Sequence, residues 1–184
     1  MIVFDKVTKQ FPLGNTSLDE VSFEVEENEF VFLVGPSGAG KTTIIRLIIK
    51  ELSPSSGTIV IDDLDIAAKK FNQTVDLRRK IGVIFQDFKI LLDKNIFENV
   101  ALGLKVVNFP THKIKEEVKK SLAFVNLSQK EKVFPSQLSA GELQRVAIAR
   151  ALIGDRKIIL ADEPTGNLDP KTSWEIMKIF KKIE

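Results

Sequence analysis

The sequence predicts an α/β fold in which helices cover a parallel sheet. Short continuous apolar runs, typical of strands buried on both faces, occupy residues 30–34, 81–85 and 158–161. A glycine-rich loop follows the first of these runs and leads into a helix expected at 42–52. Later segments carry apolar residues at spacings of three and four, which is the helical period. Strands that alternate with helices in this way favour a parallel sheet.

The N-terminal part has a different pattern. Val21, Phe23 and Val25 alternate with polar residues, as expected for a half-buried antiparallel strand. Residues 1–5 and 58–61 also have the composition of strands. We therefore expect an antiparallel β subdomain in addition to the parallel sheet.

The region from about residue 88 to residue 137 is helical in character and is interrupted by Pro110 and Pro135. It resembles a helical subdomain inserted between the second and third apolar runs. The helices are expected at 96–104, 114–127, 140–152 and 171–183.

Composition excludes several classes of protein. The chain has 27 basic and 25 acidic residues, and this balance gives no electrostatic reason to expect a nucleic acid as partner. Disulfides and thiolate metal sites are excluded because there is no cysteine, and a single histidine, His112, argues against a histidine metal site. No apolar run approaches the roughly 18 residues of a membrane span, and the N-terminus lacks the plan of a signal peptide. A protein that stays soluble inside the cell is expected.

Residues 35–42 match the phosphate-binding loop pattern GxxxxGK[ST]. Glycines let backbone N–H groups wrap phosphates at the N-terminus of the following helix. Lys41 would reach the β- and γ-phosphates of a nucleotide, and the Thr42 hydroxyl would bind Mg²⁺. A plain flexible turn is the alternative, but the expected strand and helix flank the loop as the mechanism requires. The residues expected to hold phosphate are Gly35, Pro36, Ser37, Gly38, Ala39, Gly40, Lys41, Thr42 and Thr43.

Two acidic residues follow the apolar run at 158–161. Asp162 is expected at the carboxyl end of that strand, where α/β sheets bind ligands. It would hold Mg²⁺ through water, while Glu163 would act on the attacking water as general base. A surface acidic pair is the simpler alternative, and the phosphate-binding loop upstream argues against it.

Residues 138–142, Leu-Ser-Ala-Gly-Glu, resemble the signature sequence of the ATP-binding-cassette (ABC) ATPases. In that family Ser139 and Gly141 would contact the γ-phosphate of ATP held by the other subunit of a dimer. Ala140 and Glu142 depart from the commonest form. Ser139 could also be an ordinary N-cap with Glu142 completing a capping box, and both readings can hold together.

Three further segments fit the ABC pattern. Gln86 resembles the Q-loop glutamine, which touches Mg²⁺ and the lytic water and so counts among the catalytic residues with Glu163 and Lys41. Phe11 lies where the family places an aromatic ring against adenine. A surface glutamine and a core phenylalanine are the alternatives. The D-loop, for which a helix-capping turn is the alternative, would be Asn167, Leu168 and Asp169.

The resemblance covers the whole chain and implies the P-loop NTPase core of an ABC nucleotide-binding domain. We expect a single domain at 1–184. About 1–87 and 157–184 would form the nucleotide-binding core with its β subdomain, and about 88–156 the helical subdomain that ends in the signature helix. The expected ligands are ATP and Mg²⁺, held between two copies that dock head to tail.

Within the family, residues 77–88, 97–101 and 161–169 resemble the FtsE ATPases of cell division. That resemblance implies an FtsX-like membrane partner, peripheral binding to the inner face of the plasma membrane, and coupling to cell-wall hydrolysis. The partner would dock beside the Q-loop. The residues that could line this groove, or instead pack inside the helical subdomain, are Phe88, Ile90, Leu91 and Leu92.

The family pattern continues with a strand that ends in a switch histidine, whereas this sequence ends at Glu184, within the preceding helix. His112 lies in the wrong region to replace that histidine. A truncated C-terminal end and slow hydrolysis are therefore expected.

Three other functions agree with part of the sequence. The nearest is the ATPase of a transporter that releases lipoproteins, exports macrolides or imports amino acids. An ABC ATPase of DNA repair would carry long heptads or zinc-binding cysteines, which are missing here. A non-catalytic nucleotide-binding module is favoured only by the missing C-terminal segment.

Overall fold

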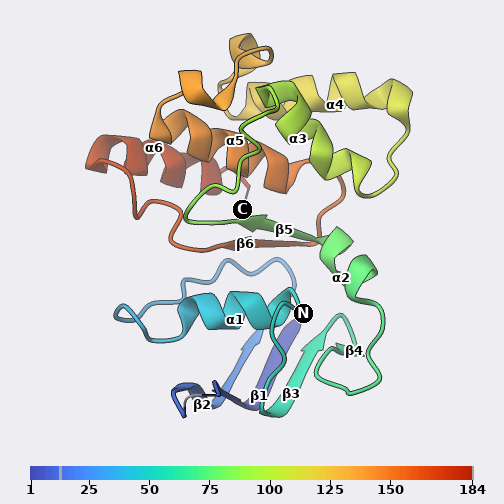
Figure 1. Ribbon diagram of the computed structural model, residues 1–184, viewed down its shortest axis with the longest axis vertical. Coiled ribbons are helices and arrows are strands. Elements are labelled where there is room, and N and C mark those ends of the chain that lie inside the picture. Colours follow the sequence, from blue (N-terminus) through green and yellow to red (C-terminus); the bar gives the residue numbers. More distant parts are fainter. Residues whose placement is uncertain (13, 184) are drawn as a thin grey trace. The chain divides into compact units, whose positions relative to one another are not determined.

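The computed structural model describes residues 1–12 and 14–183 (Figure 1). The chain divides into two compact units, Met1–Leu77 and Arg78–Glu184. The boundary falls within helix α2 (Thr74–Lys80).

The first unit is built on a four-stranded antiparallel sheet with strand order β2-β1-β3-β4. The central strand β1 pairs with β2 on one side and β3 on the other, so that Phe4 lies opposite Phe23 and Ile59. The rings of Phe4 and Phe23 stack with their centroids 4.5 Å apart, and Ile59 is fully buried. The antiparallel β subdomain predicted from alternation is present. The strands are β1 (Ile2–Gln10), β2 (Thr16–Val25), β3 (Ser56–Ile61) and β4 (Leu64–Asp65).

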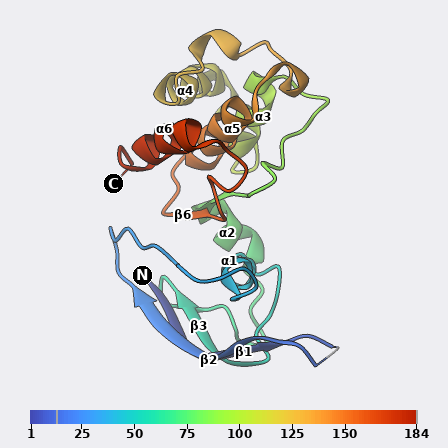
Figure 2. The same cartoon turned by 90° about the vertical axis from the view of Figure 1, so that its left-hand side faces the viewer.

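Helix α1 (Lys41–Ile48) lies beside this sheet (Figure 2). Four apolar residues of α1, including Ile44 and Leu47, are buried. The helix was predicted to reach residue 52 but ends earlier, because Lys50 takes a left-handed conformation with φ 55°. The Glu51 N–H then bonds back to the Arg46 carbonyl at 2.9 Å, which closes the last turn.

The prediction of a buried strand at residues 30–34 is wrong. These residues have no strand assignment, and the side chains of Phe32 and Val34 are 66% and 85% exposed. A strand requires a hydrogen-bonded neighbour, and among the described residues of this unit the sheet contains only β1 to β4. An apolar run indicates burial but does not identify the neighbouring strand that would supply it.

The second unit contains two parallel strands, β5 (Ile81–Ile84) and β6 (Ile158–Ala161), with Ile81 opposite Ile158. These are the second and third apolar runs of the sequence, and the prediction of parallel pairing is confirmed for them. Gly82 lies so close to α5 that a Cβ at this position would overlap the Ala151 carbonyl.

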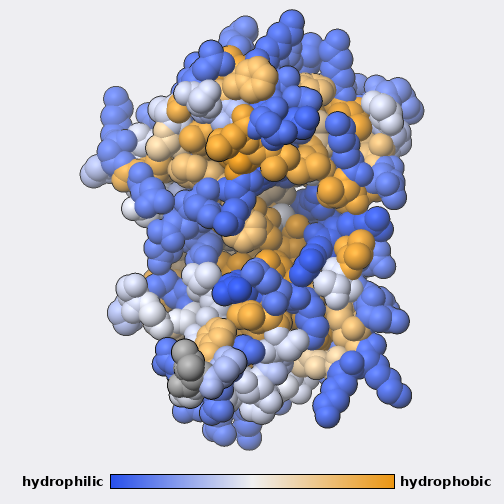
Figure 3. Space-filling view, in the orientation of Figure 1, coloured by the Kyte–Doolittle hydropathy of each residue, from blue (hydrophilic) through white to orange (hydrophobic). Residues whose placement is uncertain are grey.

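Helices cover this strand pair and share one apolar core. Over these helices Figure 3 shows apolar side chains at the surface beside charged ones. The helices are α3 (Ile96–Lys105), α4 (Thr111–Phe124), α5 (Ala140–Leu152) and α6 (Pro170–Phe180), with short 3₁₀ turns at Ser128–Lys130 and Pro135–Gln137. Side chains buried in the core include Val100, Leu104, Val118, Leu122, Ile148 and Ile176.

Two helix ends differ from the prediction. Helix α4 was expected to reach residue 127, but Asn126 has φ 60° and the Leu127 N–H bonds to the Leu122 carbonyl at 2.8 Å. This left-handed residue and the bond that follows it are a Schellman-type helix end, which asparagine favours. Helix α6 ends at Phe180 instead of 183.

Candidate active site

The glycine-rich loop belongs to the first unit and leads into α1. Gly38 and Gly40 have φ of 81° and 89°, a conformation that residues with side chains rarely adopt. At Gly40 space is also restricted, since a Cβ there would lie 2.6 Å from Leu18 Cδ2 and 2.7 Å from the Ser17 carbonyl oxygen. The shape of the loop therefore requires glycine at Gly40, which the pattern specifies, and at Gly38, which the pattern leaves open.

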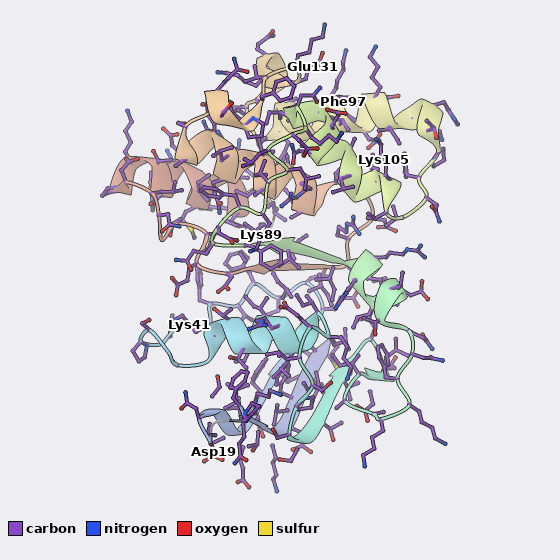
Figure 4. The ribbon with its side chains drawn as sticks, in the orientation of Figure 1. Asp19, Lys41, Lys89, Phe97, Lys105 and Glu131 are labelled. Carbon is purple, nitrogen blue, oxygen red and sulfur yellow. The ribbon has the colours of Figure 1, made fainter. Side chains whose placement is uncertain are left out.

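Lys41 is the first residue of α1, and its side chain turns back over the loop (Figure 4). Its Nζ donates to the Gly35 carbonyl at 2.9 Å and to the Pro36 carbonyl at 3.0 Å. The ammonium group and the positive end of the helix dipole therefore lie at the same loop. This combination is suited to binding an anion such as a phosphate group.

The two threonines after Lys41 have different surroundings. The Thr42 side chain is exposed, whereas Thr43 is half-buried and its hydroxyl lies 2.8 Å from the Ser17 hydroxyl of β2. That hydrogen bond attaches the start of α1 to the sheet. The Thr42 hydroxyl is therefore the more accessible of the two.

Phe11 follows β1 at the start of the turn toward β2. Its N–H donates to the Asn15 carbonyl at 2.9 Å, and Lys9 Nζ lies 5.4 Å from the centre of its ring. The side chain is half-buried and is not part of the buried core of the chain. This disfavours the alternative interpretation of Phe11 as a core residue.

The acidic pair lies in the second unit, at the carboxyl end of β6. Asp162 is only 8% exposed, and its N–H donates to the Ile84 carbonyl at 2.9 Å. Glu163 is exposed and has φ 44°, so the chain changes direction at this residue. The Gly166 N–H closes the turn by donating to the Glu163 carbonyl at 3.0 Å. One carboxylate is thus buried at the strand end, while the next one projects from a turn.

Gln86 follows the neighbouring strand β5, and its side chain comes close to Glu163. A Cβ built on Gly166 would lie 3.5 Å from Glu163 Oε2 and 3.6 Å from Gln86 Nε2, so both polar groups face the same glycine. Asn167 Nδ2 donates to the Gln86 carbonyl at 3.2 Å. The structure therefore brings together Gln86, the acidic pair and Asn167, because β5 and β6 are parallel neighbours that end at the same edge.

The signature-like segment begins α5. The Ser139 N–H donates to Glu142 Oε2 at 3.0 Å, and the Glu142 N–H donates to Ser139 Oγ at 3.3 Å, which forms a complete capping box. The bond from the Ser139 backbone N–H is the main reason that the pKa of Glu142 lies below its usual range, and Lys130 lowers it further. Gly141 is buried against Thr172 of α6.

Asp169 caps the N-terminus of α6, accepting hydrogen bonds from the Lys171 and Thr172 N–H groups at 3.1 Å each. The Thr172 side chain, which also bonds to this carboxylate, is the main cause of a lowered pKa for Asp169. The capping turn that was the alternative interpretation is therefore present. Leu168 packs against the helical core.

The apolar residues that follow Gln86 differ in their burial. Ile90 packs against the helical core, whereas Leu91 and Leu92 are exposed, Leu92 by 77%. Phe88 and Lys89 both have positive φ, of 59° and 48°, and Lys89 is labelled in Figure 4.

Sequence reasoning missed three polar residues that hold these loops. Arg150 of α5 donates to the Phe88 and Lys89 carbonyls at 2.7 and 2.6 Å. The fully buried amide of Asn99 bonds to both backbone groups of Leu91, and Gln144 of α5 donates to the Pro164 carbonyl at 2.7 Å. A polar residue on the apolar side of a predicted helix was the available signal for Asn99 and Gln144.

Residues 18–166 match the family described as ABC transporter. The chain belongs to this family. As an ABC ATPase it is 47% identical to the cell division ATP-binding protein FtsE of Bacillus subtilis, over 183 residues that cover 100% of the chain and 80% of the relative. It is 42% identical to the FtsE of Mycobacterium tuberculosis, covering 100% of the chain and 80% of the relative.

This ABC ATPase also resembles a methionine import ATP-binding protein, MetN of Haemophilus influenzae, with 42% identity over 100% of the chain but 54% of the relative. Among solved structures, the dimeric structure of MJ0796, a bacterial ABC transporter cassette, superposes with a TM-score of 0.89 at 36% identity. The match covers 100% of this chain and 82% of MJ0796. The fold expected from the resemblance is thereby confirmed. In the described residues no helix has the length and apolar character needed to cross a membrane.

Proposed function

We propose that this ABC ATPase is the FtsE-type subunit of a membrane complex, in which ATP hydrolysis drives an FtsX-like partner that controls cell-wall hydrolysis during division. The assignment rests on 47% identity to the FtsE of Bacillus subtilis, against 42% for the MetN relative. One structural observation supports ATP hydrolysis at this site most directly. Gln86 Nε2 and Glu163 Oε2 face the same glycine, Gly166.

The nucleotide phosphates would be held by the loop at 35–42. Its backbone N–H groups and the start of α1 bind the phosphate oxygens, and Lys41 exchanges its bonds to the Gly35 and Pro36 carbonyls for bonds to phosphate. Phe11 supplies a half-buried ring against which adenine stacks.

Three side chains assigned to magnesium have donor atoms of the right chemical type. The Thr42 hydroxyl, the Gln86 amide oxygen and the Asp162 carboxylate, this last through water, are hard oxygen donors of the kind that Mg²⁺ prefers. When bound, Mg²⁺ would neutralise charge on the phosphate oxygens. The Asp162 carboxyl is already largely buried, so it loses little further hydration on binding.

Glu163 acts as general base on the attacking water, and Gln86 orients that water. The exposed position of Glu163 in a tight turn keeps its carboxylate accessible to water and substrate, in contrast to the buried Asp162. The two acidic neighbours therefore have separate roles, which their different burial supports.

A second copy would complete each site. Ser139 and Gly141, with Ala140 and Glu142, face the nucleotide held by the other copy, and the D-loop at 167–169 lies near the dimer contact. The support is the relationship to MJ0796, whose structure in a post-hydrolysis state bound to ADP and Pi is dimeric.

The membrane partner would dock beside the Q-loop, on the cytoplasmic face of the membrane. Of the four apolar residues considered from sequence, Leu91 and Leu92 are exposed and would contact the partner. Asn99 would hold their backbone, because its buried amide bonds to the N–H and carbonyl of Leu91.

The decisive experiment is to cross-link the tagged protein in its own cells and to identify the membrane protein that co-purifies. A small FtsX-like protein with a large extracellular loop supports the division role. A multi-spanning permease with a methionine-binding or other cargo-binding subunit contradicts it. Leu92→Asp should abolish the cross-link, while Phe124→Asp, which changes an exposed apolar residue of α4, should leave it intact.

A further inference from the structure

Gln144 is a polar residue in the buried face of α5. Its side chain is 1% exposed, and its Nε2 donates to the Pro164 carbonyl at 2.7 Å. A carbonyl can only accept, so the amide is oriented with its NH₂ group toward Pro164. This bond joins the signature helix to the turn that follows Glu163.

The carbonyl oxygen of the Gln144 side chain, Oε1, indicates that core packing alone does not account for a glutamine at this position. Its Oε1 is buried and has no hydrogen-bond partner among the described residues. A buried polar atom without a partner destabilises the folded chain, whereas an apolar side chain of the same shape would not. An apolar side chain would therefore fill this position of the core at lower cost. What glutamine adds is the hydrogen bond to the Pro164 carbonyl.

The turn that Gln144 holds contains the candidate general base. Glu163 has φ 44°, in the left-handed region that non-glycine residues seldom occupy. Such a conformation persists only where surrounding contacts stabilise it. Two bonds do so here, namely that of the Gly166 N–H to the Glu163 carbonyl and that of Gln144 to the next carbonyl along the chain.

We propose that Gln144 is a positioning residue for Glu163, and that through it the signature helix controls the catalytic carboxylate of its own copy. The proposal rests on the proposed function, in which Glu163 is the general base. The same helix begins at Ser139, which faces the nucleotide of a second copy. A shift of α5 when the second copy engages Ser139 therefore moves the Pro164 carbonyl and with it the Glu163 side chain, which links the two sites of the dimer.

Gln144→Met tests the proposal because it keeps the length of the side chain and removes its hydrogen-bonding groups. The single-turnover rate of ATP hydrolysis should fall at least about tenfold, since a misplacement of about 1 Å can slow a reaction about 10²-fold. ATP affinity should stay within about twofold. The melting temperature should change little, because removal of the unpaired Oε1 offsets the lost bond to Pro164. Gln129→Met makes the same chemical change at an exposed residue and should alter none of these values.

A double-mutant cycle separates positioning from a general structural effect. If Gln144 acts through Glu163, adding Gln144→Met to Glu163→Gln should slow the residual rate little further. Effects that multiply would overturn the proposal, as would a Gln144→Met variant with wild-type turnover. A Glu163→Gln variant that hydrolyses at the wild-type rate would instead contradict the proposed function.

Gln144→Glu provides a second variant should the methionine variant fail to fold. Its carboxyl group can donate to the Pro164 carbonyl only when protonated, and burial raises the pKa of such a group. Its rate relative to wild type should therefore rise as the pH falls. A ratio that does not change with pH would overturn the proposal.

Discussion

Gly141 in the signature-like segment and Thr172 in α6 are packed so closely that a Cβ on Gly141 would overlap Thr172 Cγ2. The glycine therefore allows α5 and α6 to approach each other, in addition to the backbone contact with phosphate that the ABC resemblance implies. Its conformation is ordinary helix, so space and not backbone freedom requires glycine at this position.

Gly141→Ala should lower the free energy of unfolding by about 1–3 kcal/mol, the usual effect of overpacking. Thr172→Ser removes the methyl group that is overlapped and keeps the hydroxyl that bonds to Asp169. The double variant should recover most of the stability, as measured by denaturant unfolding. Strictly additive losses would show that the two residues are not in contact.

Lys41→Met should weaken ATP binding by about 1.5–3 kcal/mol, because a charged hydrogen-bond donor to the phosphates is lost. Titration calorimetry of the wild type and the variant measures this difference. Because Lys41 Nζ bonds to the carbonyls of its own loop, at Gly35 and Pro36, the melting temperature without nucleotide should change little. Unchanged affinity would refute the assignment of the loop.

Glu163→Gln should slow the chemical step by about 10²–10⁴-fold, as expected for the loss of a general base. The amide keeps the shape of the side chain, so ATP binding should be retained and ATP-bound dimers should accumulate. Single-turnover hydrolysis and size-exclusion chromatography with ATP measure the two effects. Normal turnover would exclude Glu163 as the base.

Phe11→Ala should reduce ATP affinity by about 1–3 kcal/mol if the ring stacks on adenine. Affinity for inorganic triphosphate should not change, because that ligand has no base to stack. Phe124→Ala, which removes an exposed ring from the second unit, serves as the control. Equal losses for ATP and triphosphate would favour a structural role for Phe11.

The stability of the folded chain should depend on the ionisation of Glu142. Hydrogen bonding from the Ser139 backbone, followed by Lys130, holds the pKa of this carboxyl below its ordinary value of 4.5. A group whose folded pKa is lowered contributes stability above the unfolded pKa and loses that contribution as the pH falls through the folded pKa. Unfolding curves between about pH 7 and pH 3 should show this loss in the wild type, and the loss should be smaller in Glu142→Gln, in which Asp169 still contributes its own share.

Local sequence signals predicted the second unit well. The runs at 81–85 and 158–161 form β5 and β6, and the residues that follow them, Gln86 and Glu163, lie together because parallel neighbours end at one edge. The helix at 140–152 has the predicted bounds, since Ser139 and Glu142 form a capping box that is visible in sequence.

The sequence was less informative where a structure depends on a distant partner. The run at 30–34 has the composition of a buried strand but is exposed in the structure. Pairing requires another strand, and periodicity does not identify one. Likewise Ile90 and Leu92 look alike in sequence, yet one packs on the helical core and the other is exposed.

By itself, the sequence determined the family, the phosphate-binding loop, the acidic pair and the signature segment, because each depends on residues that are adjacent in the chain. Only the tertiary structure decided that Gln144 and Arg150 hold the turns at Pro164 and Lys89, over separations of 20 and 61 residues. Such bonds depend on how α5 packs against the ends of β5 and β6. Packing of this kind is set by the whole core, and no local pattern of residues encodes it.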